Sequence, residues 1–203
     1  VDICRYGRWS MNVTAERINR IIRKTAAARY LEIGVCRGET FFAVDAPFKV
    51  AVDPAFQFDT ADHESGRAHF FSMPSDDFFT SFAESDAADR LREEAGAPLF
   101  DVVFIDGLHT FEQAYRDFIN SLRYTHDKAV CSLEEPLPNA PYSALADNAK
   151  SSVYRELPGV ADASWHGEVH HARVALPDWQ VGFFIRLLAL LDMPHSVPCK
   201  VRV

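Results

Sequence analysis

The chain has 203 residues, of which 48% are hydrophobic and 25% are charged, and this size and composition suit one globular α/β domain. Its formal net charge of −8, without a long block of lysine and arginine, argues against a nucleic-acid partner or an anionic membrane. No apolar run reaches the roughly 18 residues needed to cross a bilayer, and no signal peptide is visible. We therefore expect a cytoplasmic protein.

The four cysteines support the same expectation. Cys4, Cys36, Cys131 and Cys199 lie far apart and form no Cys-x-x-Cys pair. Reduced thiols are therefore favoured over a disulfide framework.

Helical and strand-like patterns alternate along the first two thirds of the chain. Helices are predicted from apolar residues at helical spacing, and strands from short apolar runs that end in turn residues. In chain order, the sequence predicts a helix over Ser10–Ala28 with Asn12 or Thr14 as its cap, a strand over Tyr30–Ile33, a helix from near Gly38, strands over Phe48–Val52 and Ala68–Phe71, a helix entered through Ser75-Asp76-Asp77, a charged helix over Asp86–Glu94, a strand over Phe100–Ile105, a helix over Phe111–Leu122 and a strand over Lys128–Leu133.

The alternation predicts the fold class. Strands separated by helices indicate a Rossmann-like, doubly wound α/β fold, with a mostly parallel sheet and helices on both faces. From Pro136 to Pro177, prolines with Asn139, Asn148 and Gly159 indicate loops around one or two helices, and Val181–Leu191 fits either a strand or a helix. We expect a single domain, with an amino-terminal helix in residues 1–28, a cofactor-binding core in 29–135 and acceptor-side loops and last strands in 136–203.

The end of the first predicted strand has the features of a ligand-binding turn. Glu32 and Ile33 lead into Gly34, which allows a sharp turn, and Gly38 allows close approach at a helix start. Asp53 ends the second predicted strand, where a carboxylate can accept both hydroxyl hydrogens of a ribose. We predict that Glu32, Gly34, Gly38 and Asp53 bind a nucleotide-like cofactor. The alternative is an ordinary glycine turn in a sheet protein.

The turn favours S-adenosylmethionine (SAM) over a dinucleotide. A dinucleotide enzyme would carry Gly-x-Gly-x-x-Gly to bring backbone N–H groups against a pyrophosphate, but this turn has Cys36 at the second position and Glu32 before it. A ligand with a cationic amino-acid end and no phosphate fits better. Ser72 and Met73, after the third strand, are candidates for an adenine pocket, although Ser75 could instead make this stretch a plain helix cap.

Acidic residues follow the fourth and fifth predicted strands. Asp106, Glu134 and Glu135 would meet at one edge of the sheet, where their repulsion calls for a proton or a cation. Such hard oxygen ligands suit Mg²⁺ or Ca²⁺, and a bound Mg²⁺ could lower the pKa of a substrate hydroxyl. His109, three residues after Asp106, is the candidate general base.

Simpler interpretations stay open for each of these residues. Glu134 and Glu135 could form a solvated loop pair, and Asp106 could cap the next helix, with His109 in its first turn. A zinc site is disfavoured because the order of residues in His166-Gly167-Glu168-Val169-His170 is wrong for a His-Glu-x-x-His helix, even with His171 nearby.

Several stretches resemble bacterial class I SAM-dependent methyltransferases of the group called methyltransferase family 24. The similarity extends from about Ala28 to about Leu176, and its most specific part is the Ile-Asp-Gly-x-His stretch. The motifs that carry it are Tyr30–Val35 with Gly38, Phe71–Phe79, Phe104–Glu112, Phe118–Asn120 and Trp165–Val169.

The resemblance implies a Rossmann-like fold with SAM against Gly34 and Asp53. Some relatives are Mg²⁺-dependent sugar O-methyltransferases, and by motif position Asp106, Glu134 and Glu135 would hold the metal while His109 acts as the base. The chain departs from the family pattern, which usually shows His-Asp or Asp-Asp where Glu134-Glu135 stands. Each glutamate adds a methylene at a site where Mg²⁺ tolerates little geometric error.

The leading prediction is methyl transfer from SAM to a hydroxyl of a small molecule, a sugar or a secondary metabolite, assisted by Mg²⁺. One alternative is a SAM-binding protein without this catalysis, and the other is an NAD-type oxidoreductase. A homo-oligomer is compatible with the sequence, which does not reveal the acceptor.

Overall fold

The computed structural model describes residues 12–134, 144, 145, 147–156 and 167. The elements, in chain order, are α1 (Val13–Thr25), β1 (Arg29–Ile33), α2 (Glu39–Ala43), β2 (Phe48–Val52), β3 (Ala68–Phe71), α3 (Ser75–Ser81), α4 (Asp86–Ala95), β4 (Phe100–Ile105), α5 (Phe111–Ser121), β5 (Thr125–Leu133) and α6 (Asn148–Arg155), with single 3₁₀ turns at Thr60–Asp62, Phe82–Glu84 and Leu122–Tyr124. The strands form one sheet in the order β3-β2-β1-β4-β5.

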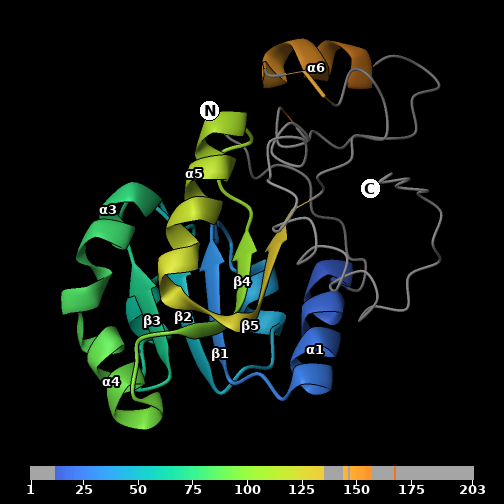
Figure 1. Cartoon of the computed structure of the whole chain (residues 1–203). Helices are drawn as coiled ribbons and strands as arrows, with labels where there is room; N and C mark the ends of the chain where they lie inside the picture. Colours follow the sequence, from blue (N-terminus) through green and yellow to red (C-terminus); the bar gives the residue numbers. More distant parts are fainter. Residues whose placement is uncertain (1–11, 135–143, 146, 157–166, 168–203) are drawn as a thin grey trace, which may run out of the picture.

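Every strand pair in this sheet is parallel, which confirms the predicted Rossmann-like class. The order runs outward from β1 in both directions, so the topological switch lies between β1 and β4. All strand arrows point to the same end of the molecule (Figure 1). The carboxyl ends of the strands therefore share one edge.

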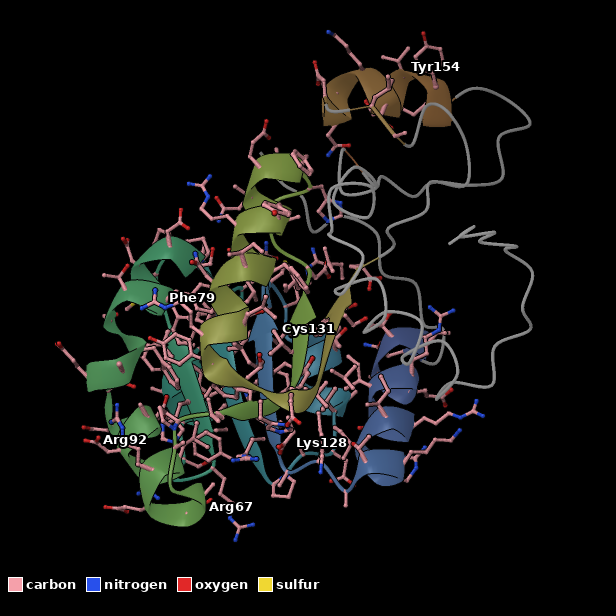
Figure 2. The ribbon with its side chains drawn as sticks, viewed as in Figure 1. Arg67, Phe79, Arg92, Lys128, Cys131 and Tyr154 are labelled. Carbon is pink, nitrogen blue, oxygen red and sulfur yellow. The ribbon has the colours of Figure 1, made fainter. Side chains whose placement is uncertain are left out.

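Two apolar cores hold the helices against opposite faces of the sheet. One core joins α3, α4 and α5 to the face that carries Leu31 and Val103. The other joins α1 and α2 to the face that carries Tyr30 and Phe104. Figure 1 shows the resulting three layers, and Figure 2 shows Phe79 of α3 on the first face. Each interior strand is thus buried on both sides, as its apolar composition predicts.

The first helix has one of its predicted caps but ends at Thr25, three residues before the predicted end at Ala28. The side chain of Asn12 accepts a 2.9 Å hydrogen bond from the Ala15 N–H, which caps α1. The helix stops at Ala26, whose φ of 54° is left-handed. Asn12, and not Thr14, is therefore the cap among the two predicted candidates.

The amino end of the sheet is fixed by one carboxylate. Asp101 at the start of β4 accepts 2.9 Å hydrogen bonds from the backbone N–H groups of Ala28 and Arg29, and it also binds the Arg29 guanidinium and Nε2 of His126. Burial alone would raise the pKa of Asp101, but these hydrogen bonds hold it well below its usual range. The carboxylate ties β1, β4 and β5 together.

Three sequence predictions need correction. Asn148, predicted in a loop, is the first residue of α6, which Asp147 caps. In α5, Ile119 of the predicted apolar stripe is 37% exposed, whereas the polar Asp117 is buried. Strand β5 starts at Thr125, three residues before the predicted start, because Thr125 pairs with Phe100 of β4 ahead of an irregularity in the register. The prediction for Val181–Leu191 lies outside the described residues.

Within the described part, none of the helices combines the length and apolar character of a membrane-crossing segment.

Candidate active site at the carboxyl edge of the sheet

Backbone hydrogen bonds bring the predicted site residues to one edge of the sheet. The N–H of Gly34 donates to Val52 O at 2.8 Å, and the N–H of Asp106 donates to Ile33 O at 2.8 Å. The N–H of Glu134 continues the ladder by donating to Ile105 O at 2.9 Å. The loops after β1, β2, β4 and β5 are therefore contiguous. In Figure 1 this edge is the end of the sheet nearer α6.

The turn after β1 requires glycine at Gly34. Its φ is +84°, a conformation that other residues rarely adopt, and a Cβ built there would overlap the carbonyl oxygen of Asp106. Gly38 also has a positive φ, of +76°, and precedes α2. The turn thus brings the backbone of Gly34 directly against the loop after β4, with no side chain between them.

Asp53 lies beside this turn, as the sequence predicts. One of its carboxylate oxygens accepts a 2.8 Å hydrogen bond from the Cys36 N–H and the other a 2.7 Å bond from the Ala55 N–H. Only 9% of the residue is exposed. The two bonds orient the carboxylate, so the glycine turn and Asp53 form one unit. The binding of a ribose by Asp53 stays a prediction.

Glu32, the other acidic residue predicted to bind the cofactor, lies almost fully buried on the α1/α2 face. It is 2% exposed, and its Oε2 accepts a 2.6 Å hydrogen bond from the Tyr30 hydroxyl. Burial raises the pKa of Glu32 to about 8; the Tyr30 hydrogen bond opposes this rise, and the charge of Asp106 adds to it. Burial likewise raises the pKa of Tyr30 well above its usual value. The acidic edge therefore includes a carboxyl group that stays protonated in neutral solution.

The loop after β4 pairs the predicted base with a carboxylate. Nε2 of His109 lies 3.4 Å from Oδ1 of Asp106, and the histidine side chain is 15% exposed. Thr110, and not Asp106, occupies the N-cap position of α5, so the simpler helix-cap interpretation of Asp106 is wrong. Gly167 packs on this loop from far along the chain, since a Cβ there would overlap the His109 carbonyl oxygen.

The loop after β5 supplies a second carboxylate. Oε1 of Glu134 accepts a 3.4 Å hydrogen bond from the Thr14 hydroxyl of α1. The charges of Glu134 and Asp106 both add to the raised pKa of Glu32, so each of these two residues lies within electrostatic reach of Glu32. Glu135 falls outside the described residues, as do His166, His170 and His171. Among the residues that are described, no group of three or more metal-binding side chains is assembled.

The residues after β3 are placed differently from one another. Ser72 is exposed and Met73 is half-buried against the core formed by α3, α4 and α5. The alternative that Ser75 caps α3 is wrong, because Pro74 holds the cap position and the Ser75 hydroxyl bonds to Asp117 instead. The adenine pocket at Ser72 and Met73 stays a prediction.

The cysteine prediction holds for one residue and fails for another. Cys131 of β5, labelled in Figure 2, is a free thiol whose pKa burial raises to about 12. Cys36, in the cofactor turn, is disulfide-bonded and not reduced as expected. Neither sulfur is therefore placed to act as a nucleophile.

Sequence analysis missed Tyr30, Thr14, Asp117 and Gly167 as residues that touch this edge. Only Tyr30 carried a detectable signal, since positions two apart on a strand share a face and Tyr30 precedes Glu32 by two. Thr14 and Gly167 meet the site through contacts of long sequence separation, which local patterns do not reveal.

A parallel sheet with this order, with a glycine turn after β1 and an acidic residue after β2, is the architecture of Rossmann-like nucleotide-binding domains. The family model described as a methyltransferase domain, of methyltransferase family 24, matches residues 31–135, just over half of the chain. The chain belongs to this family of class I methyltransferases, which use SAM. The predicted family is thus confirmed, and the oxidoreductase alternative is contradicted.

The solved structures to which the chain is similar are distant from it in sequence. A putative O-methyltransferase from Klebsiella pneumoniae is 16% identical over 85% of this chain and 72% of its own, with a TM-score of 0.53. The O-methyltransferase TomG from Streptomyces achromogenes, solved with SAM, is 16% identical over 84% and 71%, with a TM-score of 0.46. An O-methyltransferase from Bacillus cereus, in complex with SAH, is 14% identical over 67% and 66%, with a TM-score of 0.47. No curated protein sequence matches the chain.

Proposed function

We propose that the chain transfers the methyl group of SAM to a hydroxyl group of a small molecule, a sugar or a secondary metabolite, with assistance from Mg²⁺. The observation that carries this proposal is the pair formed by His109 and Asp106, 3.4 Å apart, on the loop that abuts Gly34. A proton-accepting side chain thus stands next to the turn that would hold the methyl donor.

The charge of this edge supports a cationic ligand. Asp106 and Glu134 place two carboxylates at this edge beside the protonated Glu32, and Lys49 is a cationic neighbour whose charge lowers the pKa of Glu32. The Lys49 amino group is itself occupied by the carbonyl oxygens of Phe41 and Val44. SAM supplies an electrophilic methyl group on a positively charged sulfur together with an α-amino group, and both charges complement the acidic edge. The oriented carboxylate of Asp53 suits the ribose hydroxyls.

His109 has the geometry of a general base held by a carboxylate. Nε2 of His109 faces Oδ1 of Asp106 at 3.4 Å, so in the proposed site the carboxylate orients the ring with its Nε2–H directed towards Asp106. We assign the other ring nitrogen, Nδ1 of His109, to take the proton of the acceptor hydroxyl. Transfer of this proton leaves an oxygen nucleophile for the methyl group.

The chemistry of two carboxylates at this edge supports the proposed Mg²⁺. Asp106 and Glu134 follow neighbouring strands and offer carboxylate oxygens, the ligands that Mg²⁺ prefers, and we propose Glu135 as the third. A bound Mg²⁺ would lower the pKa of the acceptor hydroxyl. Asp106 would then serve both the metal and His109.

The test is production of S-adenosylhomocysteine from SAM by the purified protein with sugar and phenolic acceptors, before and after EDTA and after re-addition of Mg²⁺. Turnover that EDTA removes and Mg²⁺ restores is expected. Undiminished turnover in EDTA would contradict the metal's role. SAM binding without turnover on any acceptor would favour the non-catalytic alternative, and absence of SAM binding would overturn the whole proposal.

A further inference from the structure

A buried carboxylate on α5 is not used by the proposed chemistry. Asp117 is 1% exposed, and its Oδ1 accepts hydrogen bonds of 2.6 Å from the Ser75 hydroxyl and 2.9 Å from Nε2 of Gln113. Nε2 of Gln113 also donates to the Ser75 oxygen at 3.1 Å. The three side chains form a closed network, in which each member contacts both others.

The network joins two of the loops that form the candidate site. Ser75 is the first residue of α3 and stands two residues after Met73, on the proposed adenine side. The second carboxylate oxygen of Asp117 lies 3.6 Å from where a Cβ of Gly107 would be, and Gly107 directly follows Asp106. The carboxylate therefore lies between the loop after β3 and the loop that carries Asp106 and His109.

A simple packing role explains this residue poorly. Burial raises the pKa of Asp117, and the hydrogen bonds from Ser75 and Gln113 only partly oppose it, so the group costs free energy where it stands. An apolar residue of similar size would fill the same space without this cost. Unlike an apolar residue, the carboxylate makes directional hydrogen bonds, and these fix the side chains of Ser75 and Gln113 in one geometry.

We propose that Asp117 is a positioning residue that, through Ser75 and Gln113, holds the loop after β3 at a fixed distance from the loop of Asp106 and His109. The inference rests on the proposed function, since it gives these loops their roles at the two ends of the methyl donor. A shift between them would misalign the donor and the base without removing either.

The experiment compares Asp117→Ala, Ser75→Ala, the double variant and the conservative Asp117→Asn. Ser121→Ala is the matched control, because Ser121 is also fully buried on α5 but its hydroxyl donates to Phe118 O, away from both loops. For each protein, kcat and the KM for SAM are measured well below the unfolding temperature, together with amide hydrogen exchange of residues 72, 73 and 107–110.

Asp117→Ala and Ser75→Ala are expected to lower kcat roughly ten- to a hundredfold and to speed exchange in both loops. The double variant should be little worse than either single one, because both remove the same network. Asp117→Asn keeps the Oδ1 acceptor and should recover most of kcat. Ser121→Ala should lower only the unfolding temperature.

Two outcomes would overturn the inference. One is a loss of kcat in Asp117→Ala no larger than in Ser121→Ala, and the other is unchanged exchange in both loops. Failure of the proposed function is distinguishable, because the wild-type protein would then bind no SAM and transfer no methyl group, while the exchange measurement would still report on the network.

Discussion

The Tyr30 hydroxyl donates a 2.6 Å hydrogen bond to Oε2 of Glu32, and both residues are almost fully buried beneath the edge that carries Asp106. Tyr30 stabilises the carboxylate, but burial opposes ionisation more strongly. The site is therefore built over a group whose ionisation the fold resists.

This pair predicts how stability depends on pH. Because the pKa of Glu32 is about 8 when folded and near 4.5 otherwise, the folded chain holds a proton that the unfolded chain has lost between these values. The free energy of unfolding should therefore fall as pH rises from about 4.5 to 8, by up to about 1.4 kcal/mol per pH unit. Denaturant unfolding across this range measures the slope.

Glu32→Gln provides the comparison for this slope, since its amide oxygen can still accept from Tyr30. We expect the variant to be more stable than the wild type at pH 8, with the difference shrinking towards pH 5. Glu93→Gln, at an exposed position of α4, should leave the slope unchanged. Equal slopes in Glu32→Gln and the wild type would show that Glu32 is ionised in the folded protein.

The crowding at Gly34 predicts a loss of both stability and SAM binding in Gly34→Ala. The variant combines strain from a φ of +84°, costing about 1–3 kcal/mol, with overlap on the Asp106 carbonyl oxygen. Gly96→Ala is the matched control, because Gly96 has a φ of +78° but open space around it. It should show the strain alone, with SAM affinity unchanged in calorimetry. Equal effects of the two substitutions would contradict close approach at Gly34.

Asp53→Ala is expected to weaken SAM binding about tenfold or more, which corresponds to about 1.4 kcal/mol. The change removes the proposed ribose ligand and leaves the Cys36 and Ala55 N–H groups without their carboxylate. Asp59→Ala controls for the loss of a turn carboxylate, since Asp59 accepts from the Ala61 N–H in the same segment. Titration calorimetry compares the two, and unchanged affinity in Asp53→Ala would remove the residue from the binding site.

His109→Gln should lower kcat roughly 10²- to 10⁴-fold, the usual contribution of a general base, with little change in SAM affinity. Single-turnover measurements at saturating SAM separate these quantities. A kcat within a few-fold of wild type would reject His109 as the base and leave the metal as the sole activator of the acceptor.

The sheet could be predicted almost completely because its strands are short apolar runs bounded by turn residues. The predicted bounds of β2, β3 and β4 match the structure exactly. The start of β5 could not be predicted, since Thr125, His126 and Asp127 are polar and the only one of them that pairs with β4 is Thr125, opposite Phe100. A pattern of apolar residues indicates buried segments, so it does not identify the polar start of β5 at the edge of the sheet.

The location of the site could be predicted for a similar reason: strand ends are recognisable, and a parallel sheet gathers them. The hydrogen-bond partners of each side chain could not be predicted from the sequence. Asp117 is a polar residue outside the predicted apolar stripe of α5, and its partner Ser75 is 42 residues away in the sequence. Their contact is therefore visible only in the fold. Likewise, the glycine turn pointed to Glu32 as a ligand, whereas burial against Tyr30 is a tertiary effect.

The hydrogen bonds of Asp101 have a consequence for how this protein can change. They anchor β1, β4 and β5 at the end of the sheet that is remote from His109, so the alignment of these strands does not depend on the loops that meet the acceptor. Under the proposed function, substitutions in those loops, apart from the closely packed Gly34, should alter acceptor preference while the strands keep their alignment.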